Sequence, residues 1–271
     1  MDVTHALLLI GIGLFVGFIG TLIGAGGGFI LVPVLLLLLP GLKPEVITSI
    51  SLAIVFLNAA SGSIAYAKMK RIDYRSALTF AVAALPGSIL GAFSTSLIPE
   101  RVFDLILGFV LIIIAVFLLL RPEVRKKITA KDQSKLVHRS IIDNKGQLYE
   151  YAFNQRTGII ISFVVGYLSS LLGIGGGIIH VPALTSILNF PIHVATATSH
   201  LILVIMALAG TLVHIFQGNL TGHLLTLLYI GFGVVVGAQG GAFFSHHAKP
   251  NWIIRALAFA LLLVGIRIII M

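Results

Sequence analysis

The 271-residue sequence contains no cysteine, which excludes disulfides and thiol chemistry. Charge is also scarce: 10% of the residues are charged, 58% are hydrophobic, and the mean hydropathy is +1.10. A soluble protein of this length needs more polar surface than this composition supplies. Because long apolar runs recur from end to end, the sequence predicts an all-α polytopic membrane protein that lies in a lipid bilayer.

Acidic residues are missing from the middle of every apolar segment, since Glu45, Asp73, Glu100 and Asp104 all lie near segment ends. A cation transporter or a carboxylate-driven proton pump usually needs such a residue. There is no Ser/His/Asp arrangement, HExxH motif or Walker loop, and the adjacent pair 246–247 of histidines is a weak metal signal. The sequence therefore predicts no metal, no cofactor and no enzymatic activity.

The net charge of +9 is unevenly distributed, because nine of the eighteen Lys and Arg residues fall between Arg121 and Arg156. Four more lie between Lys68 and Arg75. Basic loops between apolar spans are typical of the cytoplasmic side of a membrane protein. Aromatic residues do not alternate with the basic ones, so nucleic-acid binding is not expected.

The sequence contains an internal duplication. "GTLIGAGGGFILVPVL" from Gly20 returns as "SSLLGIGGGIIHVPAL" from Ser169, and "EVITSIS" from Glu45 returns as "HVATATS" from His193. The repeated glycines and prolines share an offset of 149: Gly24, Gly26, Gly27, Gly28 and Pro33 with Gly173, Gly175, Gly176, Gly177 and Pro182. We interpret residues 1–120 as a first transmembrane repeat, 121–156 as a basic cytoplasmic linker, and 157–271 as a second transmembrane repeat.

Each repeat contains five apolar segments, and the first of them lacks the basic flank of a secretory signal, so we expect it in the mature fold. The expected segments are 5–24, 28–39, 46–67, 76–97 and 102–120, then 157–173, 177–189, 194–216, 223–245 and 252–270. Most reach the ~20 residues that a helical span needs. The second segment of each repeat is too short, which predicts about eight full spans and two short broken or re-entrant helices.

The basic residues indicate opposite orientations for the two repeats. The loop 216–223, which corresponds to the basic loop 68–75, contains no Lys or Arg, whereas the next loop contains Lys249. An odd number of crossings per repeat produces this change of side, so an inverted repeat of five plus five segments, with both termini outside, is favoured. A parallel four-plus-four arrangement with re-entrant short segments is the alternative.

Glycine clusters and prolines interrupt helices, and such irregular backbone at membrane depth is tolerated where it is buried or lines a wet cavity. Inverted repeats with broken helices are a recurring plan of secondary transporters. A helix that starts after Gly-Gly-Gly offers free backbone N–H groups and the positive end of its dipole. Two such starts predict a paired anion-binding site, with Pro33 and Pro182 in structural roles. The isolated pairs Gly87/Gly91 and Gly233/Gly237 predict close helix packing instead.

Polar side chains within the apolar segments are candidates for substrate contacts. Hydroxyl and amide groups can donate hydrogen bonds to an oxyanion without carrying charge. The alternative is that the hydroxyl groups bond to their own helix carbonyls. The candidates that complete the site are Thr48, Ser51, Asn58, Thr196, Ser199 and Gln239.

His200 follows Ser199 directly, where the first repeat has Leu52. Histidine can carry a proton near neutral pH, so His200 is a candidate for proton coupling. A buried neutral histidine that bonds to a carbonyl is the alternative, and the same applies to His180.

The linker sequence "RSIIDNKGQLYEYAFNQ" alternates around Asn144-Lys145-Gly146, which predicts a small β-hairpin on the cytoplasmic side. A solvated tether near anionic lipid is the alternative.

The twice-repeated G-x-G-G-G-x4-P, the Thr/Ser-rich third segments and the "G-x3-G-A" of the fourth segments resemble the sulfite exporter TauE/SafE family over nearly the whole chain. The resemblance implies a multi-pass permease of the cytoplasmic (inner) cell membrane that moves small sulfur-containing anions. The positions that match the family's signature are Gly24, Gly26–Gly28, Pro33, Gly173, Gly175–Gly177 and Pro182.

From these observations we expect a secondary transporter that exports a small oxyanion, sulfite or an organosulfonate such as sulfoacetate, by alternating access. An anion channel, a carrier of another small organic anion, and a membrane scaffold or sensor are the alternatives. The coupling ion, a proton or sodium, and assembly into a homo-oligomer stay open.

Overall fold

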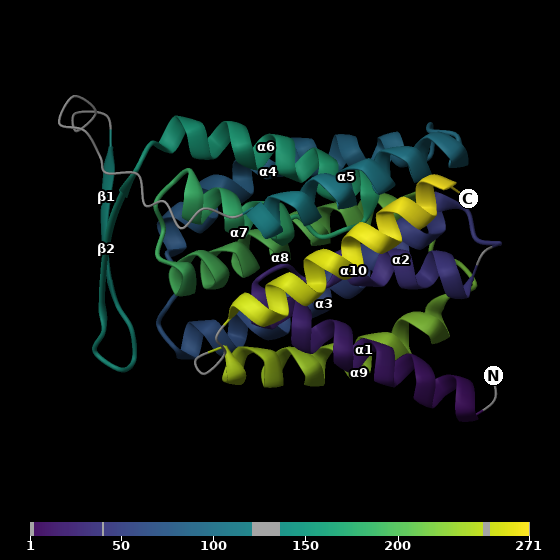
Figure 1. Ribbon diagram of the computed structural model, residues 1–271, viewed down its shortest axis with the longest axis horizontal. Coiled ribbons are helices and arrows are strands. Elements are labelled where there is room, and N and C mark those ends of the chain that lie inside the picture. Colours follow the sequence, from purple (N-terminus) through teal and green to yellow (C-terminus); the bar gives the residue numbers. More distant parts are fainter. Residues whose placement is uncertain (1–2, 40, 121–135, 246–249, 271) are drawn as a thin grey trace.

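The computed structural model describes residues 3–39, 41–120, 136–245 and 250–270 of this chain, which form ten helices and one β-hairpin in that part (Figure 1). The first half contains five helices: α1 (Val3–Ile23), α2 (Gly28–Leu38), α3 (Pro44–Lys68), α4 (Tyr74–Thr95) and α5 (Glu100–Leu120). The hairpin and the second half follow: β1 (Val137–Ile142), β2 (Leu148–Phe153), α6 (Gln155–Leu172), α7 (Gly177–Ser186), α8 (Ile192–Phe216), α9 (Leu224–Phe244) and α10 (Pro250–Ile270). The predicted apolar segments are thus helices, and the helical membrane architecture is confirmed.

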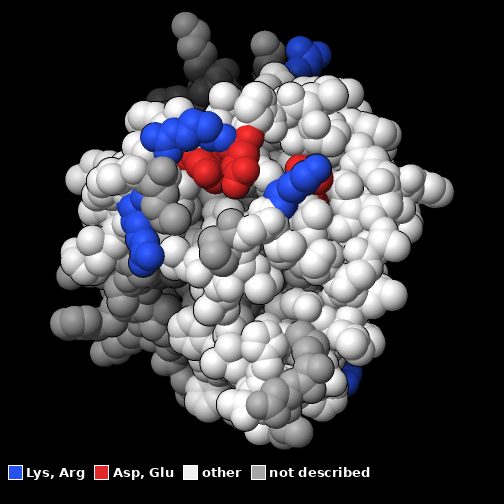
Figure 2. Space-filling model, turned by 90° about the vertical axis from the view of Figure 1, so that its right-hand side faces the viewer, with Lys and Arg blue, Asp and Glu red and all other residues white. Residues whose placement is uncertain are grey.

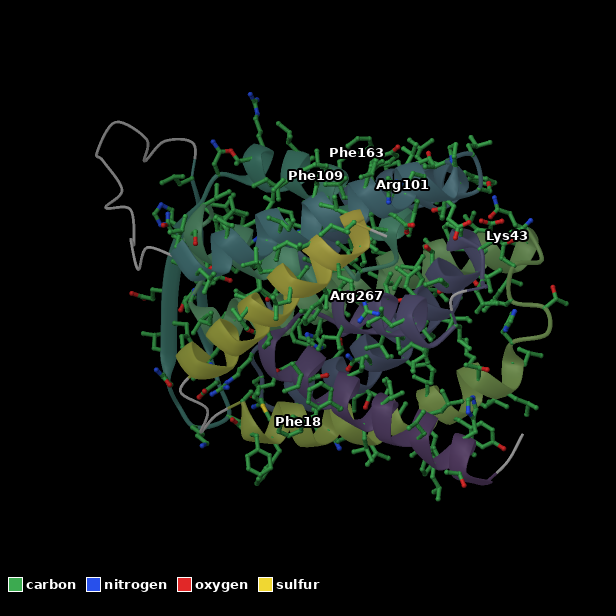
Figure 3. All side chains as sticks on the ribbon, turned by 45° about the vertical axis from the view of Figure 1, so that its right-hand side comes forward. Phe18, Lys43, Arg101, Phe109, Phe163 and Arg267 are labelled. Carbon is green, nitrogen blue, oxygen red and sulfur yellow. The ribbon has the colours of Figure 1, made fainter. Side chains whose placement is uncertain are left out.

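Six of these helices are long and apolar enough to cross a membrane: α1, α3, α4, α6, α8 and α9. The two helices that follow the Gly-Gly-Gly runs, α2 and α7, are shorter, with 11 and 10 residues. Large apolar side chains cover the outside of the bundle, including Phe109 and Phe163 at 57% and 42% exposure (Figure 3). Such a surface suits contact with lipid.

Local sequence explains several helix ends. Pro44 begins α3, where its missing N–H group costs nothing. Asp73 caps α4, because its side chain accepts a hydrogen bond from the Ser76 N–H group. Asn154 caps α6 in the same way, by accepting hydrogen bonds from the N–H groups of Arg156 and Thr157. Glycine terminates both α1 and α6, because Gly24 and Gly173 adopt positive φ angles of 85° and 67°.

The helices of the two halves interleave. α1 packs along α9, α6 packs along α4, and α5 packs along α10, while α3 and α8 contact each other at the centre. The predicted β-hairpin of the linker is confirmed as well, with β1 and β2 antiparallel and Val137 opposite Phe153. Residues 121–135, and the 246–249 loop with its two histidines and Lys249, lie outside the described residues.

Glycine allows the closest of these helix pairs to form. A Cβ atom at Gly237 of α9 would overlap the backbone carbonyl oxygen of Leu14 in α1. Likewise, a Cβ atom at Gly91 of α4 would overlap the carbonyl oxygen of Tyr167 in α6. The packing role predicted for the isolated glycine pairs is therefore confirmed.

We predict that Gly237→Ala lowers the stability of the protein, because its Cβ atom would meet a backbone group that cannot rotate away. Overpacking of this kind costs about 1–3 kcal/mol. Gly11→Ala in α1 is the matched control, since a Cβ atom there would have no neighbour within 4 Å. Thermal unfolding in detergent measures both variants. Equal midpoints for Gly237→Ala and Gly11→Ala would contradict the packing role.

Candidate functional site

Two buried loops interrupt the helices of the bundle: the first glycine loop, 24–27, and the second glycine loop, 173–176. In the first loop Gly24, Gly26 and Gly27 have φ angles of 85°, 79° and 83°. In the second loop Gly173 and Gly175 have φ angles of 67° and 69°. Residues other than glycine rarely adopt this conformation. The glycine clusters are therefore needed for the path of the backbone, as well as for the close approach of neighbouring atoms.

The two glycine loops touch each other. A Cβ atom at Gly28 would lie 2.5 Å from the carbonyl oxygen of Gly173, and one at Gly177 would overlap the carbonyl oxygen of Gly24. The helix starts of the two halves therefore meet backbone to backbone inside the bundle. Val55 of α3 and Leu203 of α8 both pack against this junction, since each would lie within 3.2 Å of a Cβ atom at Gly26.

Side chains of α3 and α8 hold the opposite loops in place. Ser51 donates a hydrogen bond to the carbonyl oxygen of Gly173 at 2.6 Å, and Ser199 donates one to that of Gly24 at 3.3 Å. Thr48 packs against Gly173, and Thr196 packs against Gly24. These candidate residues do lie at the glycine loops, and the two serines bond to the other half rather than to their own helices.

Both short helices begin with unpaired donors. The carbonyl oxygen of Gly27 accepts the N–H groups of Ile30 and Leu31, and the carbonyl oxygen of Gly176 accepts those of Ile179 and His180. Within the described part of the chain, the N–H groups of 27–29 and of 177–178 have no hydrogen-bond partner. Free N–H groups at a helix start attract anions, and the helix dipole adds to this attraction. Pro33 and Pro182 lie inside α2 and α7, as the sequence placed them.

Asn58 stands beside the start of α2. Its Oδ1 atom accepts a hydrogen bond from the Thr21 hydroxyl at 2.5 Å, which leaves Nδ2 facing the first glycine loop. Asn58 is fully buried, and its Nδ2 atom has no partner among the described residues. A buried donor without an acceptor is costly, so the position favours a bound acceptor.

His200 is buried next to Thr21 and Tyr66. Its Nδ1 atom lies 3.2 Å from the carbonyl oxygen of Thr196, which places the proton on Nδ1. Its Nε2 atom is buried and has no partner among the described residues. The Tyr66 hydroxyl donates to the Thr21 carbonyl oxygen, and the Tyr66 ring meets the imidazole edge to face at 5.2 Å.

Other candidates lie elsewhere. Gln239 donates to the backbone and hydroxyl oxygens of Ser61, both at 2.8 Å, and bonds to neither glycine loop. His180 contacts the Ser162 hydroxyl at 3.0 Å. In the part of the chain that the structure describes, no three His, Cys, Asp or Glu residues come together as metal ligands.

Sequence reasoning missed Thr21 and Ser169, which lie in the last turns of α1 and α6. Ser169 is fully buried, packs next to Gly176, and has no partner for its hydroxyl among the described residues. The available signal was a polar residue within five positions of each Gly-x-Gly-Gly-Gly run.

The hairpin fastens one end of the bundle. Arg71 in the α3–α4 loop pairs with Asp143 of the hairpin turn at 3.2 Å, and both side chains are buried. The Tyr151 hydroxyl donates to Asp73 at 2.8 Å, and the Asp73 N–H donates to the Thr198 hydroxyl at 3.1 Å. We call these residues, Arg71, Asp73, Asp143, Tyr151 and Thr198, the hairpin clasp. Through Asp73, the clasp connects the linker to Thr198 of α8, which is the residue before Ser199.

Burial by itself raises the pKa of Asp143. The N–H groups of Gln147 and Lys145 and the guanidinium group of Arg71 outweigh this effect and hold the pKa below its ordinary value. Burial, together with the nearby Asp73 carboxylate, raises the pKa of Tyr151, so its hydroxyl stays protonated and continues to donate.

Comparison with known proteins bears on the whole chain. The family model described as sulfite exporter TauE/SafE matches residues 9–268. "Probable membrane transporter protein YunE" of Bacillus subtilis (strain 168) is 33% identical over 268 residues, which cover 97% of this chain and 96% of that protein. "Probable membrane transporter protein MJ0441" of Methanocaldococcus jannaschii is 27% identical over 236 residues, which cover 84% of this chain and 79% of that protein. No solved structure was found to match.

We predict that the hairpin clasp weakens in acid. The pKa of Asp143 is lower in the folded protein than the ~3.9 of an unfolded chain, so its stabilising effect is complete above about pH 4 and is lost as the pH falls through the lowered value. Hydrogen exchange of the hairpin amides should show steady protection from about pH 7 to 5 and a decline below about 4.

Asp143→Asn should lose protection at neutral pH and show a flatter pH dependence, whereas the exposed Glu150→Gln should behave like wild type. Unchanged protection in Asp143→Asn would contradict the role of the ion pair.

Proposed function

Because this chain belongs to the sulfite exporter TauE/SafE family of membrane transporters, we propose that it exports a small sulfur-containing oxyanion across the cytoplasmic membrane. The substrate class is sulfite or an organosulfonate such as sulfoacetate. The protein is a transporter and not an enzyme, in keeping with its family. The observation that carries the proposal is the contact between two helix starts whose N–H groups are buried and unpaired.

The lining of this junction suits an anion. Its polar groups are backbone N–H groups and carbonyl oxygens, hydroxyls and the Asn58 amide, and all of these are neutral. The described side chains that are both buried and charged are Arg71, Asp73 and Asp143, which belong to the hairpin clasp. The unpaired N–H groups at the two helix starts and the positive ends of the helix dipoles favour an anion over a cation.

An inverted repeat accounts for the arrangement of the elements. Each half has the order long helix, short helix and three long helices, and the first helix of each half packs on the fourth of the other. Both ends of the described chain lie at one end of the molecule, opposite the hairpin (Figure 1). Thus α1 begins at the end with the termini, and α6 begins at the hairpin end. We take 1–120 and 157–271 as the two repeats, joined by the linker 121–156.

The distribution of charge orients the molecule. The hairpin end carries the 68–75 loop with its four basic residues, the clasp and the start of α6. The opposite end carries a few basic and acidic side chains next to one another on an otherwise largely uncharged surface, and Lys43 and Arg101 belong to this side (Figures 2 and 3). By the positive-inside rule the hairpin end faces the cytoplasm.

Alternating access then follows from rocking of the two halves about the glycine junction. Val55 and Leu203 pack against this junction, and the hairpin clasp joins the two halves at the hairpin end. Release of the clasp opens the path to the cytoplasm. His200, with its unpartnered Nε2 atom, is the candidate that takes up a proton during the cycle; sodium coupling is the alternative.

The test is sulfite and sulfoacetate flux in proteoliposomes, with and without an imposed pH gradient. We predict saturable flux that Gly27→Leu and Gly176→Leu both abolish, because Val16 and Val165 leave no room for a side chain at these positions. Gly11→Leu, which faces open space, is the control and should transport like wild type.

Flux by both loop variants at the wild-type rate would contradict the site. Flux without saturation or counterflow would identify a channel instead of a carrier.

A further inference from the structure

The starts of α2 and α7 differ chemically although they occupy equivalent places. A Cβ atom at Gly27 would meet Val16 and Asn58, whereas one at Gly176 would meet Val165 and Met206. Met206 therefore stands where Asn58 stands in the other half. The proposed function treats the two helix starts as one paired site, and the following inference rests on that proposal.

The start of α2 is the polar side. The backbone nitrogen of Gly27 and the Nδ2 atom of Asn58 both lie against Gly20 of α1, at 2.5 and 2.7 Å from the place of a Cβ atom there. The Thr21 hydroxyl fixes the amide of Asn58 in this orientation. These two donors therefore lie close together, and neither has an acceptor among the described residues. An anionic oxygen is the partner that such a group of donors lacks.

The start of α7 is the apolar side. The terminal methyl group of Met206 would lie 2.8 Å from a Cβ atom at Gly176, and the nearest atom of Val165 would lie 2.7 Å from it. Met206 also belongs to a buried apolar cluster with Val55, Ala59, Ala84, Leu203 and Ala207. The Cβ atom of Ser169 also lies 3.2 Å from the place of a Cβ atom at Gly176, and the Ser169 hydroxyl, which has no partner among the described residues, is a neutral donor. The apolar surroundings of Gly176 therefore suit a small hydrocarbon group of the ligand better than a second charged group.

No full positive charge lies among the described residues that contact the two loops. The start of a helix contributes about half an elementary charge. The cost of burying an ion rises with the square of its charge, so a dianion needs far more compensation than neutral donors provide.

We propose that the ligand is a monoanion with one apolar side: its oxyanion group binds at the start of α2 through Asn58, and its apolar group lies against Met206. Within the class proposed above, this favours a short alkanesulfonate over doubly charged sulfoacetate; singly protonated sulfite has the favoured charge and lacks the apolar group. Asn58 is then the residue that determines specificity.

The experiment measures binding of ethanesulfonate, sulfoacetate and sulfate to the purified full-length protein in nanodiscs by calorimetry at pH 7. For wild type we expect ethanesulfonate to bind at least tenfold more tightly than sulfate or sulfoacetate. Asn58→Leu should weaken ethanesulfonate binding at least tenfold, because a hydrogen bond to a buried charge is lost. Thr211→Val is the matched control in a buried helix, since the hydrogen bond that the Thr211 hydroxyl makes among the described residues goes to the carbonyl oxygen of Ala207 in its own helix.

A second variant tests the apolar side. Met206→Asn places an amide at the start of α7 and should reduce the preference for ethanesulfonate over sulfate. Thermal unfolding in the same nanodiscs verifies that each variant is folded.

The outcomes separate the two proposals. Sulfate or sulfoacetate binding as tightly as ethanesulfonate, or unchanged binding by folded Asn58→Leu, would overturn the asymmetric monoanion site while leaving an oxyanion transporter in place. Failure of wild type to bind any of these anions or sulfite would overturn the proposed function as well.

Discussion

The backbone contact between the two glycine loops is the constraint on which the rest of the structure depends. Two chain segments can approach this closely only where neither carries a side chain, and Gly28 and Gly177 meet the carbonyl oxygens of Gly173 and Gly24. The positive φ angles of the neighbouring glycines then turn the chain into α2 and α7. Because these helices start at the contact, their free N–H groups gather at the centre of the bundle.

Broken helices at membrane depth require their polar groups to be satisfied within the protein. Ser51 and Ser199 meet part of this need by bonding to carbonyl oxygens of the opposite half. The N–H groups at the helix starts stay unpaired, and so does the Asn58 amide nitrogen. The junction thus keeps buried donors that have no partner among the described residues, and an anionic oxygen would supply the acceptor that they lack.

Much of this architecture could be predicted from the sequence, because it depends on local signals. The doubled glycine and proline motif located α2 and α7, apolar runs located the long helices, and alternation around Asn144-Lys145-Gly146 located the hairpin. Contacts between distant segments could not be predicted in the same way. Nothing local indicates that Ser51 reaches Gly173, or that Gln239 bonds to Ser61 instead of facing the glycine loops.

The site was predictable in its composition and less so in its geometry. Thr48, Ser51, Thr196 and Ser199 do lie at the junction, and their part in binding stays a prediction. The contrast between Asn58 and Met206 is visible in the aligned repeats, yet its meaning depends on knowing that both face a helix start. The hairpin clasp depends on Arg71 and Asp143, which are 72 residues apart, so no periodic pattern pairs them.

The most direct test is an experimental structure of the protein with selenite, the heavier analogue of sulfite, at a pH where it is singly protonated. We predict an anomalous scattering peak beside the N–H groups of Gly27 and Gly28 and the Nδ2 atom of Asn58. A peak found only near surface basic residues such as Arg75, with none at the glycine junction, would contradict this account.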